Sequence, residues 1–304
     1  MINRGLSRFG VFFLYAMSLL PFWVLYLIAD FLFFILYHLI GYRRKVVNEN
    51  LRNSFPEKTE AERNAIERKY YKYLADLIIE TVKLISISEK ELRKRMTCEN
   101  PELGDYYFSQ GKSILGATAH YGNWEMAAQR FGMIPSSKPI IVYKPLANKI
   151  YDDFFNHTRS RFGTEMIAMK SILKKLIEYK NERSFSIFAS DQTPVKHEAH
   201  YFVNFLNQPT AVFLGIEKLA KIGDAVVVFF RIDMVKRGYY KGTIVTLCEN
   251  PKETQPYEIT KMHTSYLEQM IIERPEHWLW SHRRWKVKPE NIQQNIEPTL
   301  EKAS

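Results

Sequence analysis

The chain has 304 residues, enough for one full-sized catalytic core with an accessory segment but too few for two large domains plus a membrane region. Lysine and arginine number 43 against 33 aspartate and glutamate, a formal net charge of +10. This excess favours an anionic partner, which could be nucleic acid, anionic lipid or an acidic protein. The two cysteines, Cys98 and Cys248, form no C-x-x-C pair, which argues against a disulfide framework or a cysteine zinc site.

Residues 11–40 are almost wholly apolar, interrupted by Pro21, Asp30 and His38. Such a stretch makes roughly 45 Å of helix against a hydrocarbon core of about 30 Å. We therefore expect residues 1–41 to anchor the protein in a membrane, either by one tilted span or by breaking at Pro21 and lying partly in the interface. A cleaved signal peptide fits less well, because the apolar run continues far beyond "AMS". A buried hairpin of a soluble domain is the remaining alternative.

The rest of the chain divides by its pattern of apolar residues. Residues 42–98 show a helical stripe and predict a helical linker that packs on the core. From about residue 112, short β-like runs alternate with helical ones, which predicts an α/β domain over 99–288 with a central mixed sheet flanked by helices. We expect residues 289–304 to form a flexible tail. The expected strands cover 113–119, 139–144, 183–190, 225–232 and 242–248, and the expected helices cover 123–132, 147–162, 169–180, 209–221 and 257–273.

A histidine and a glutamate five positions apart stand in "ATAHYGNWEMA", residues 117–127. Within one helix, residues five apart point about 140° away from each other, so His120 and Glu125 can meet only if His120 lies outside the helix. The sequence predicts such a corner, because a strand ends near His120, Gly122 permits a tight turn and Asn123 is a good N-cap. Glu125 in the first helical turn could then accept one ring N–H and leave the other nitrogen free as a base.

Taken alone, this pair is a weak signal, and a structural histidine is the commoner explanation. No other group of histidine, cysteine or acidic residues has ligand spacing, so we expect no metal and no cofactor. His197 and His200 are three apart, but they lie in a polar loop and are expected to be solvated.

"HYGNWE" resembles the H-x-x-x-x-[DE] block of the lysophospholipid acyltransferase superfamily, in the form typical of the bacterial lipid A secondary acyltransferases. Four later blocks are similar to that family's blocks and follow in the same order, so the resemblance runs from about residue 5 to residue 289. Its departures are small, with Ser190 before Asp191 where the family often has proline, and Trp285 where it often has phenylalanine. The later blocks are "VYKPLANKIYDDFFNHTRSRFG", "SDQTP", "YFVNFLNQPTAV" and "HWLWSHRRWKVKP".

The resemblance implies a glycerol-3-phosphate acyltransferase-like fold and the transfer of a fatty acyl group from a thioester, usually on acyl carrier protein, to a lipid hydroxyl. His120 would act as general base and Glu125 would orient the imidazole, while the acceptor itself attacks the thioester. We expect backbone amides around Gly122 and Asn123 to stabilise the oxyanion.

Two arginines follow in "HTRSRFG" and are associated by the resemblance with binding or catalysis. We favour Arg159 for contact with a substrate phosphate or the oxyanion. Arg161, two residues on, would face a different direction in a helix, and a solvated helix end is the alternative for both. Asp191 either lines the site or is merely a turn residue.

The block "HWLWSHRRWK" places three of the five tryptophans beside Arg283, Arg284 and Lys286. Such a set suits a membrane interface that faces anionic head groups or a phosphorylated glycolipid. A packed aromatic cluster with surface arginines is the alternative. Nucleic-acid binding is disfavoured, because the basic residues accompany an apolar anchor and no nucleic-acid motif occurs.

These features predict a membrane-anchored O-acyltransferase that acts on a lipid A precursor. Its expected partners are acyl carrier protein or another acyl thioester, an anionic glycolipid acceptor and the membrane, with no nucleic acid. The expected location is the bacterial inner membrane with the catalytic domain on the cytoplasmic face. Two alternatives stay open: the same chemistry on another lipid, such as an amino-acid lipid, a glycerophospholipid or a pigment ester, and a catalytically idle lipid-binding scaffold.

Overall fold

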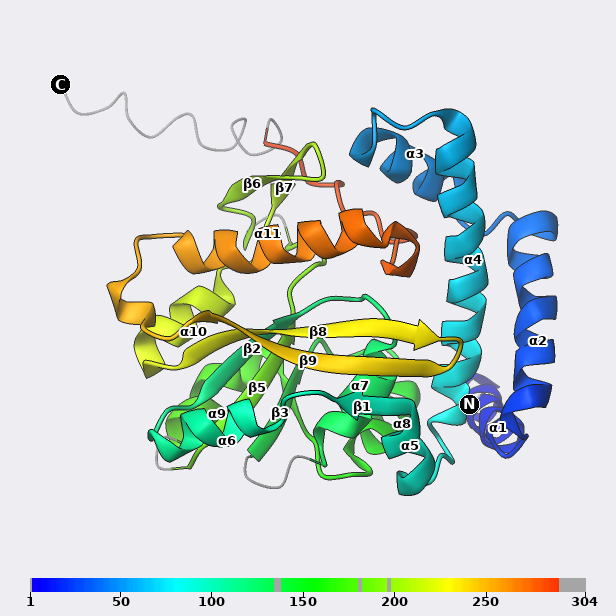
Figure 1. Ribbon diagram of the computed structural model, residues 1–304. Coiled ribbons are helices and arrows are strands. Elements are labelled where there is room, and N and C mark those ends of the chain that lie inside the picture. Colours follow the sequence, from blue (N-terminus) through cyan, green and yellow to red (C-terminus); the bar gives the residue numbers. More distant parts are fainter. Residues whose placement is uncertain (1, 134–137, 180–181, 196–197, 290–304) are drawn as a thin grey trace.

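A mixed seven-stranded sheet forms the centre of the protein in our computed structural model, which describes residues 2–133, 138–179, 182–195 and 198–289 (Figure 1). The strand order is β1-β9-β8-β2-β5-β3-β4, and all neighbours are parallel except β8 and β9. A two-stranded hairpin, β6 and β7, stands apart from it. The strands are β1 (Met96–Cys98), β2 (Ile114–Thr118), β3 (Lys138–Tyr143), β4 (Glu165–Ala168), β5 (Ser184–Ala189), β6 (Phe202–Phe205), β7 (Gln208–Ala211), β8 (Val226–Lys236) and β9 (Tyr239–Cys248).

Helices cover both faces of the sheet, as Figure 1 shows. One face packs against α10 and α11, and the other packs against α5, α6 and α7. The α/β class with a mixed, helix-flanked sheet is therefore confirmed. The helices are α1 (Ile2–Ser18), α2 (Phe22–Phe34), α3 (Arg44–Ser54), α4 (Glu60–Lys83), α5 (Glu89–Arg95), α6 (Glu102–Ser109), α7 (Trp124–Phe131), α8 (Lys149–Ser160), α9 (Ile172–Glu178), α10 (Gly215–Gly223) and α11 (Glu258–Glu273), with short turns η1 (Ile35–Leu39), η2 (Met169–Ser171), η4 (Pro251–Glu253) and η5 (Pro275–His277).

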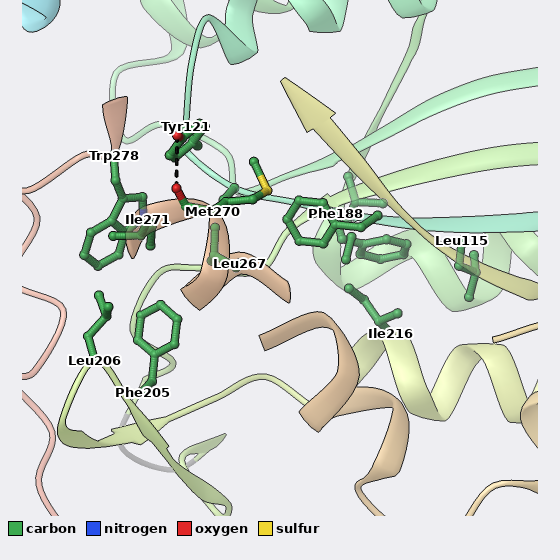
Figure 2. Packing of buried hydrophobic residues seen from close by; sticks show 14 of the residues in the cluster. Leu115, Tyr121, Phe188, Phe205, Leu206, Ile216, Leu267, Met270, Ile271 and Trp278 are labelled. Atoms are coloured by element: carbon green, nitrogen blue, oxygen red, sulfur yellow. Dashed lines mark hydrogen bonds between the residues drawn. The ribbon is translucent and has the colours of Figure 1, made fainter. Parts of the chain in front are cut away.

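Strand β2 lies in the middle of the core, and all five of its residues are buried. Its side chains alternate between the two faces, because successive residues of a strand point in opposite directions. Leu115 packs in the cluster that includes Ile216 of α10 and Leu267 of α11, part of which Figure 2 shows. Ile114 packs in the opposite cluster with Phe131 of α7. A strand buried on both faces is held rigidly, so the residue that follows it is well placed for a site.

The five strands expected from the sequence are all present, and four short ones were not predicted. Strands β1, β4, β6 and β7 have only three or four residues, too few to show a period. The prediction of a helix over 209–221 was wrong at its start, because Gln208–Ala211 pairs with Phe202–Phe205 and α10 begins at Gly215. The domain boundary at residue 99 stays a prediction, and β1 joins the sheet just before it. Apart from Pro289, the predicted tail lies outside the described residues.

Candidate active site

The carboxyl ends of two neighbouring parallel strands bring His120 and Asp191 together. Strands β2 and β5 pair in register, with Thr118 opposite Ala189. His120 and Asp191 each follow two residues after the paired position. Because both strands run in the same direction, both side chains emerge at one edge of the sheet, where open α/β folds place their sites.

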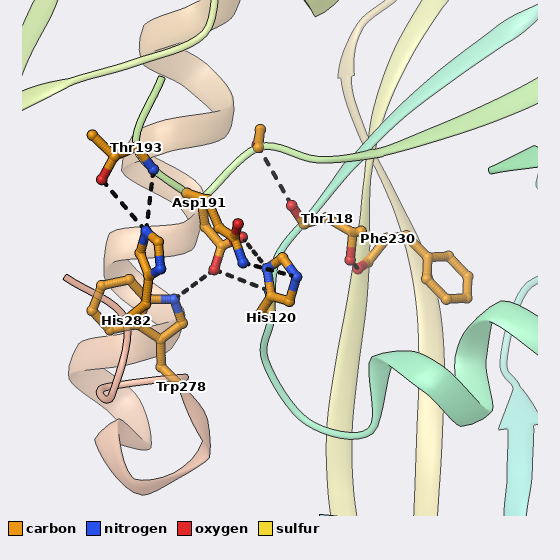
Figure 3. Close-up of polar contacts among 9 residues, drawn as sticks. Thr118, His120, Asp191, Thr193, Phe230, Trp278 and His282 are labelled. Carbon is orange, nitrogen blue, oxygen red and sulfur yellow. Dashed lines mark hydrogen bonds and ion pairs between the residues drawn. The ribbon is translucent and has the colours of Figure 1, made fainter. Parts of the chain in front are cut away.

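Asp191 holds His120 through the ring and through the backbone (Figure 3). Its Oδ1 lies 2.7 Å from Nδ1 of His120, and its Oδ2 accepts the His120 amide at 3.0 Å. The indole Nε1 of Trp278 donates to the same Oδ2 at 2.9 Å. The carboxylate therefore has three partners and fixes the imidazole in orientation.

The charges of this pair favour a defined proton arrangement. Burial opposes ionisation of Asp191, but the charge and hydrogen bond of His120 and the bond from Trp278 outweigh it and lower the pKa of Asp191 to about 2. Burial also disfavours the charged form of His120, which by itself would lower its pKa. The charges of Asp191 and, to a smaller extent, Glu125 outweigh burial and raise the pKa of His120 above its ordinary value of 6.5. With Asp191 ionised, a neutral His120 carries its proton on Nδ1 and has a bare lone pair on Nε2.

A side-chain amide lies next to the other ring nitrogen of His120. The amide Nε2 of Gln192 lies 3.3 Å from the ring Nε2. The indole of Trp124 packs edge-on against the imidazole, with ring centroids 5.0 Å apart. The His120 side chain is 21% exposed whereas that of Asp191 is 3% exposed, so the imidazole is the part of this pair that a substrate can reach.

The turn after His120 follows the predicted design. Gly122 has φ +59°, and a Cβ there would lie 2.8 Å from Ile232 Cγ2, so glycine is required. Asn123 caps α7, accepting the Met126 amide at 2.8 Å. The Gly122 amide, however, donates to the His277 carbonyl at 3.1 Å. Gly122 therefore serves the turn, and its expected role as an oxyanion donor is not supported.

Glu125 does not take the partner that the sequence predicted. It lies in the first turn of α7, as expected, but its carboxylate forms a two-pronged ion pair with Arg159 of α8. The distances are 2.8 Å from Nε to Oε2 and 2.5 Å from Nη2 to Oε1. Burial opposes ionisation, but Arg159 outweighs it and lowers the pKa of Glu125. The carboxylate that contacts the His120 ring is Asp191, so Glu125 influences His120 through its charge alone.

A buried glutamate on α4 supports the turn from behind. Oε2 of Glu80 accepts from Nδ2 of Asn123 and from the hydroxyl of Tyr240, both at 2.7 Å, and Oε1 accepts from Tyr26 of α2 at 2.9 Å. Burial raises the pKa of Glu80 to about 7. Tyr73, also on α4, donates to the Gly122 carbonyl. Helix α4 thus clamps the turn that carries Asn123.

The other predicted arginines have different surroundings. Arg161 donates to the Leu84 carbonyl at 2.7 Å and the Ile87 carbonyl at 3.0 Å, so it ties α8 to the end of α4 and faces away from Arg159. Arg283 is exposed. Arg284 is buried beside Asp191, and its Nε and Nη1 have no partner among the described residues. Arg161 is therefore a structural tie between helices, whereas Arg284 is a buried group next to Asp191 and its substrate-binding role stays a prediction.

Two of the three tryptophans of the carboxyl-terminal block lie in the core, and the third, Trp285, packs partly buried against it. Trp278 and Trp280 are almost fully buried, with ring centroids 4.7 Å apart, and Trp285 donates to Thr210 Oγ1 at 2.7 Å. The expectation of a membrane-facing aromatic block was wrong, and the packed cluster is present instead. Its backbone also pairs with the turn after β2, because the Leu279 amide donates to the His120 carbonyl at 3.1 Å.

Comparison with known proteins gives the site its context. Residues 1–287 match the family described as bacterial lipid A biosynthesis acyltransferase. The chain belongs to this family. It is 25% identical over 289 residues to the lipid A biosynthesis lauroyltransferase of Escherichia coli, covering 94% of this chain and 93% of the relative. It is 24% identical over 276 residues to a lipid A biosynthesis acyltransferase of Haemophilus influenzae, covering 89% of this chain and 84% of the relative.

The protein is thus an acyltransferase of a membrane-associated family. Within the residues that the structure describes, no group of three or more histidine, cysteine or acidic side chains could hold a metal ion. The His120 and Asp191 pair can remove a proton from a hydroxyl, the step that makes such a group nucleophilic.

Sequence reasoning about this acyltransferase missed the partner of its histidine. Asp191 was expected to line the site or to be a turn residue, Trp278 was assigned to the carboxyl-terminal aromatic block, and Gln192 was given no role. The available signal was a repeated pattern: "ILGATAH" and "FSIFASD" are both buried strands that end in a polar residue at the same offset. If two such strands are neighbours, those residues meet.

Proposed function

We propose that the acyltransferase moves a fatty acyl chain from an acyl carrier protein thioester to a hydroxyl of a lipid A precursor, at the cytoplasmic face of the inner membrane. The observation that carries the proposal is the oriented imidazole of His120, which has Nδ1 on Asp191 and a partly exposed side chain, in a chain of this family. The net charge of +10 suits both an acidic carrier protein and a phosphorylated glycolipid.

The chemistry needs one base and no enzyme nucleophile. Nε2 of His120 takes the proton of the acceptor hydroxyl while the oxygen of that hydroxyl attacks the thioester carbon. Asp191 stabilises the imidazolium that forms, as the carboxylate of a serine hydrolase triad does. The C–S bond then breaks, and the leaving thiolate takes the proton back from His120. Bonds and charges balance without a cofactor.

The oxyanion and the substrate phosphate require further donors. The amides of Asn123, Trp124 and Glu125, which have no carbonyl acceptor within the helix, are our candidates for the oxyanion. Arg159 holds Glu125 beside this turn and contributes positive charge there. Arg283 is exposed next to Thr193, which donates to its carbonyl at 3.2 Å, so it is our candidate for a phosphate of the acceptor.

The direct test is an assay with acyl carrier protein loaded with defined chains and a phosphorylated disaccharide lipid. His120→Ala should lower kcat at least about a thousandfold, because the base is lost. His200→Ala, which changes an exposed histidine, is the matched control and should keep wild-type turnover. Equal rates for His120→Ala and wild type would reject the assigned base.

The acceptor is tested separately by the lipids of a deletion strain. Loss of one acyl chain from lipid A, restored by the wild-type gene but not by the His120→Ala gene, is the expected result. An unchanged lipid A profile with a change in another lipid would indicate a different acceptor for the same chemistry. Lipid binding without any turnover would instead favour a scaffold.

A further inference from the structure

The amino-terminal helices expose an unusual amount of apolar surface. More than half of the exposed large hydrophobic side chains among the described residues lie between positions 9 and 42. On α2 they follow the helical repeat along one face, and on α1 they do the same. These residues are Trp23, Leu27, Phe31 and Phe34 on α2, and Phe9, Phe12 and Phe13 on α1. An apolar face of this extent marks a contact with a membrane or a partner.

The opposite face of α2 is fixed to the catalytic domain along its whole length. Helices α2 and α4 run side by side in opposite directions (Figure 1). Near the start of α2, the Tyr26 hydroxyl donates to Glu80 at 2.9 Å. In η1, the short π-helix that follows α2, the ring centroid of Tyr37 lies 5.4 Å from that of Tyr71.

Charge holds the middle of α2 at the edge of its exposed face, where the Asp30 side chain is 49% exposed. Arg237, at the β8–β9 hairpin, bonds both Asp30 of α2 and Asp76 of α4, with Nη2 2.6 Å from Asp30 Oδ1 and Nε 2.9 Å from Asp76 Oδ2. Leu25 and Ala29 pack into Ile79 beside this network. Helix α2 is therefore part of the domain surface and not a free stalk.

These contacts conflict with a helix that crosses the bilayer. Residues Phe22–Leu39 are apolar enough for a span, but at about 27 Å they would place Asp30 near the bilayer centre. Asp76 and Arg237 would be carried there too, together with the exposed Lys72 on α4 and Lys236 on the hairpin. Charged groups at the bilayer centre are costly, so this placement is unfavourable.

Helix α1 is docked in the same manner. A Cβ on Gly10 would lie 2.6 Å from the Tyr151 hydroxyl, which shows how closely α1 approaches α8. Lys83 of α4 donates at 2.9 Å to the Ser18 and Leu20 carbonyls, which fixes the turn between α1 and α2. Both helices thus keep their inner faces on the domain and their aromatic faces outward.

We propose that α1 and α2 do not span the membrane but lie flat in one leaflet of an anionic bilayer, with the catalytic domain resting on that leaflet. Exposed Arg8 on α1 and exposed Arg43 and Lys45 after α2 suit anionic head groups. Trp23 lies at the start of α2, and Tyr42 lies after η1. Tryptophan and tyrosine are residue types that favour the membrane interface. The membrane association of the family supports a lipid surface, rather than a protein, as the partner.

This placement would connect the lipid phase with the site. Helix α4 contacts α2 on one side and the turn after β2 on the other, through Tyr73 and Glu80. Helix α8 contacts α1 and carries Arg159. A lipid substrate in the same leaflet would then need to move only past α4 or α8 to reach His120.

The test measures the depth of α2 residues in vesicles of phosphatidylethanolamine and phosphatidylglycerol. In a background with Cys98→Ser and Cys248→Ser, a fluorophore is attached at Trp23→Cys, Leu27→Cys, Phe31→Cys or Phe34→Cys, and quenchers are placed at defined depths on the lipid chains. The proposal expects one shallow depth at all four positions. A span would make Leu27 and Phe31 much deeper than Trp23 and Phe34, and that result would overturn the proposal.

Control variants complete the experiment. A fluorophore at Tyr106→Cys, on exposed α6, should be unquenched, and absence of quenching at all four α2 positions would also reject the proposal. Leu27→Glu with Phe31→Glu should weaken vesicle binding at least tenfold, whereas Ile222→Glu on α10 should not. Because none of these measurements needs turnover, the inactive His120→Ala protein should give the same depths.

Discussion

The two carboxylates near His120, the proposed base, belong to regions of different construction. Asp191 comes from the end of β5 and binds the His120 ring, while Glu125 comes from the first turn of α7 and binds Arg159. The strand region is set by the register of two parallel strands, and the helix region is set by a cap and an ion pair. The difference separates two tasks: the strand side orients the His120 ring, and the helix side holds the charge and the turn beside it.

The largest effect is expected on the strand side. Asp191→Asn should lower kcat by about a thousandfold or more, because an amide cannot hold the Nδ1 proton and stabilise the imidazolium in the same way. Asparagine keeps the shape and an oxygen for the Trp278 indole, so the fold should persist. Steady-state kinetics with the carrier-protein donor measures the loss. A kcat within tenfold of wild type would contradict the role of Asp191 in orienting His120, and Glu125 would then be the remaining carboxylate for that role.

The helix side should be less sensitive. Glu125→Gln breaks a charged hydrogen-bond pair worth about 1–3 kcal/mol and should lower kcat by roughly tenfold to a hundredfold. In a double-mutant cycle with Arg159→Gln, the two losses should not add, because they report one interaction.

Arg161→Ala is the matched control on the same helix. It removes two bonds to backbone carbonyls and should lower thermal stability while leaving kcat nearly unchanged. If Glu125→Gln cost as much as Asp191→Asn, the proposed division between the two regions would be wrong.

The sequence predicted the main strands and the corner but not the pairing at the site. Strands β2, β3, β5, β8 and β9 are long apolar runs, and Gly122 and Asn123 are local signals of a turn and a cap. The contact between His120 and Asp191 depends on β2 lying next to β5, and strand order is not a local property. Proximity in sequence therefore favoured Glu125, which in the fold meets an arginine 34 positions away.

Composition misled in a similar way at the carboxyl end. Aromatic residues beside arginines have the same composition on a membrane surface and in a core. Many aromatic side chains of residues 9–42 are exposed, while those of Trp278 and Trp280 are buried. Only the packing distinguishes the two segments, because a tryptophan in the core needs a partner for its N–H. Trp278 finds that partner 87 positions away, in Asp191.

Glu80 supports the helix side, and its titration should affect stability. Its pKa is raised to about 7 in the folded protein from an ordinary value of 4.5. The folded state therefore favours the protonated form, so the free energy of unfolding should fall as pH rises through this window, by up to about 3 kcal/mol. Glu80→Gln should remove this slope, as measured by denaturant unfolding in detergent at several pH values. An unchanged slope would show that another group titrates.

The smallest effect concerns the open end of the imidazole. Gln192 donates to the bare Nε2, a bond that exists only while His120 is neutral. Gln192→Ala should change kcat by no more than about threefold, because a hydroxyl of the acceptor replaces this bond during turnover. The pH profile of kcat/KM is more informative, since its acidic limb reports the pKa of His120 in the free enzyme.

Substitutions of the partners of the two ring nitrogens should shift this acidic limb in opposite directions. Loss of Gln192 removes a bond to the neutral form, so the pKa of His120 and the acidic limb should rise. Loss of the Asp191 charge leaves burial as the main influence, so in Asp191→Asn the residual activity should have its limb at lower pH. Shifts in the same direction would mean that the limb reports a different group, and the assignment of His120 as the base would fail with it.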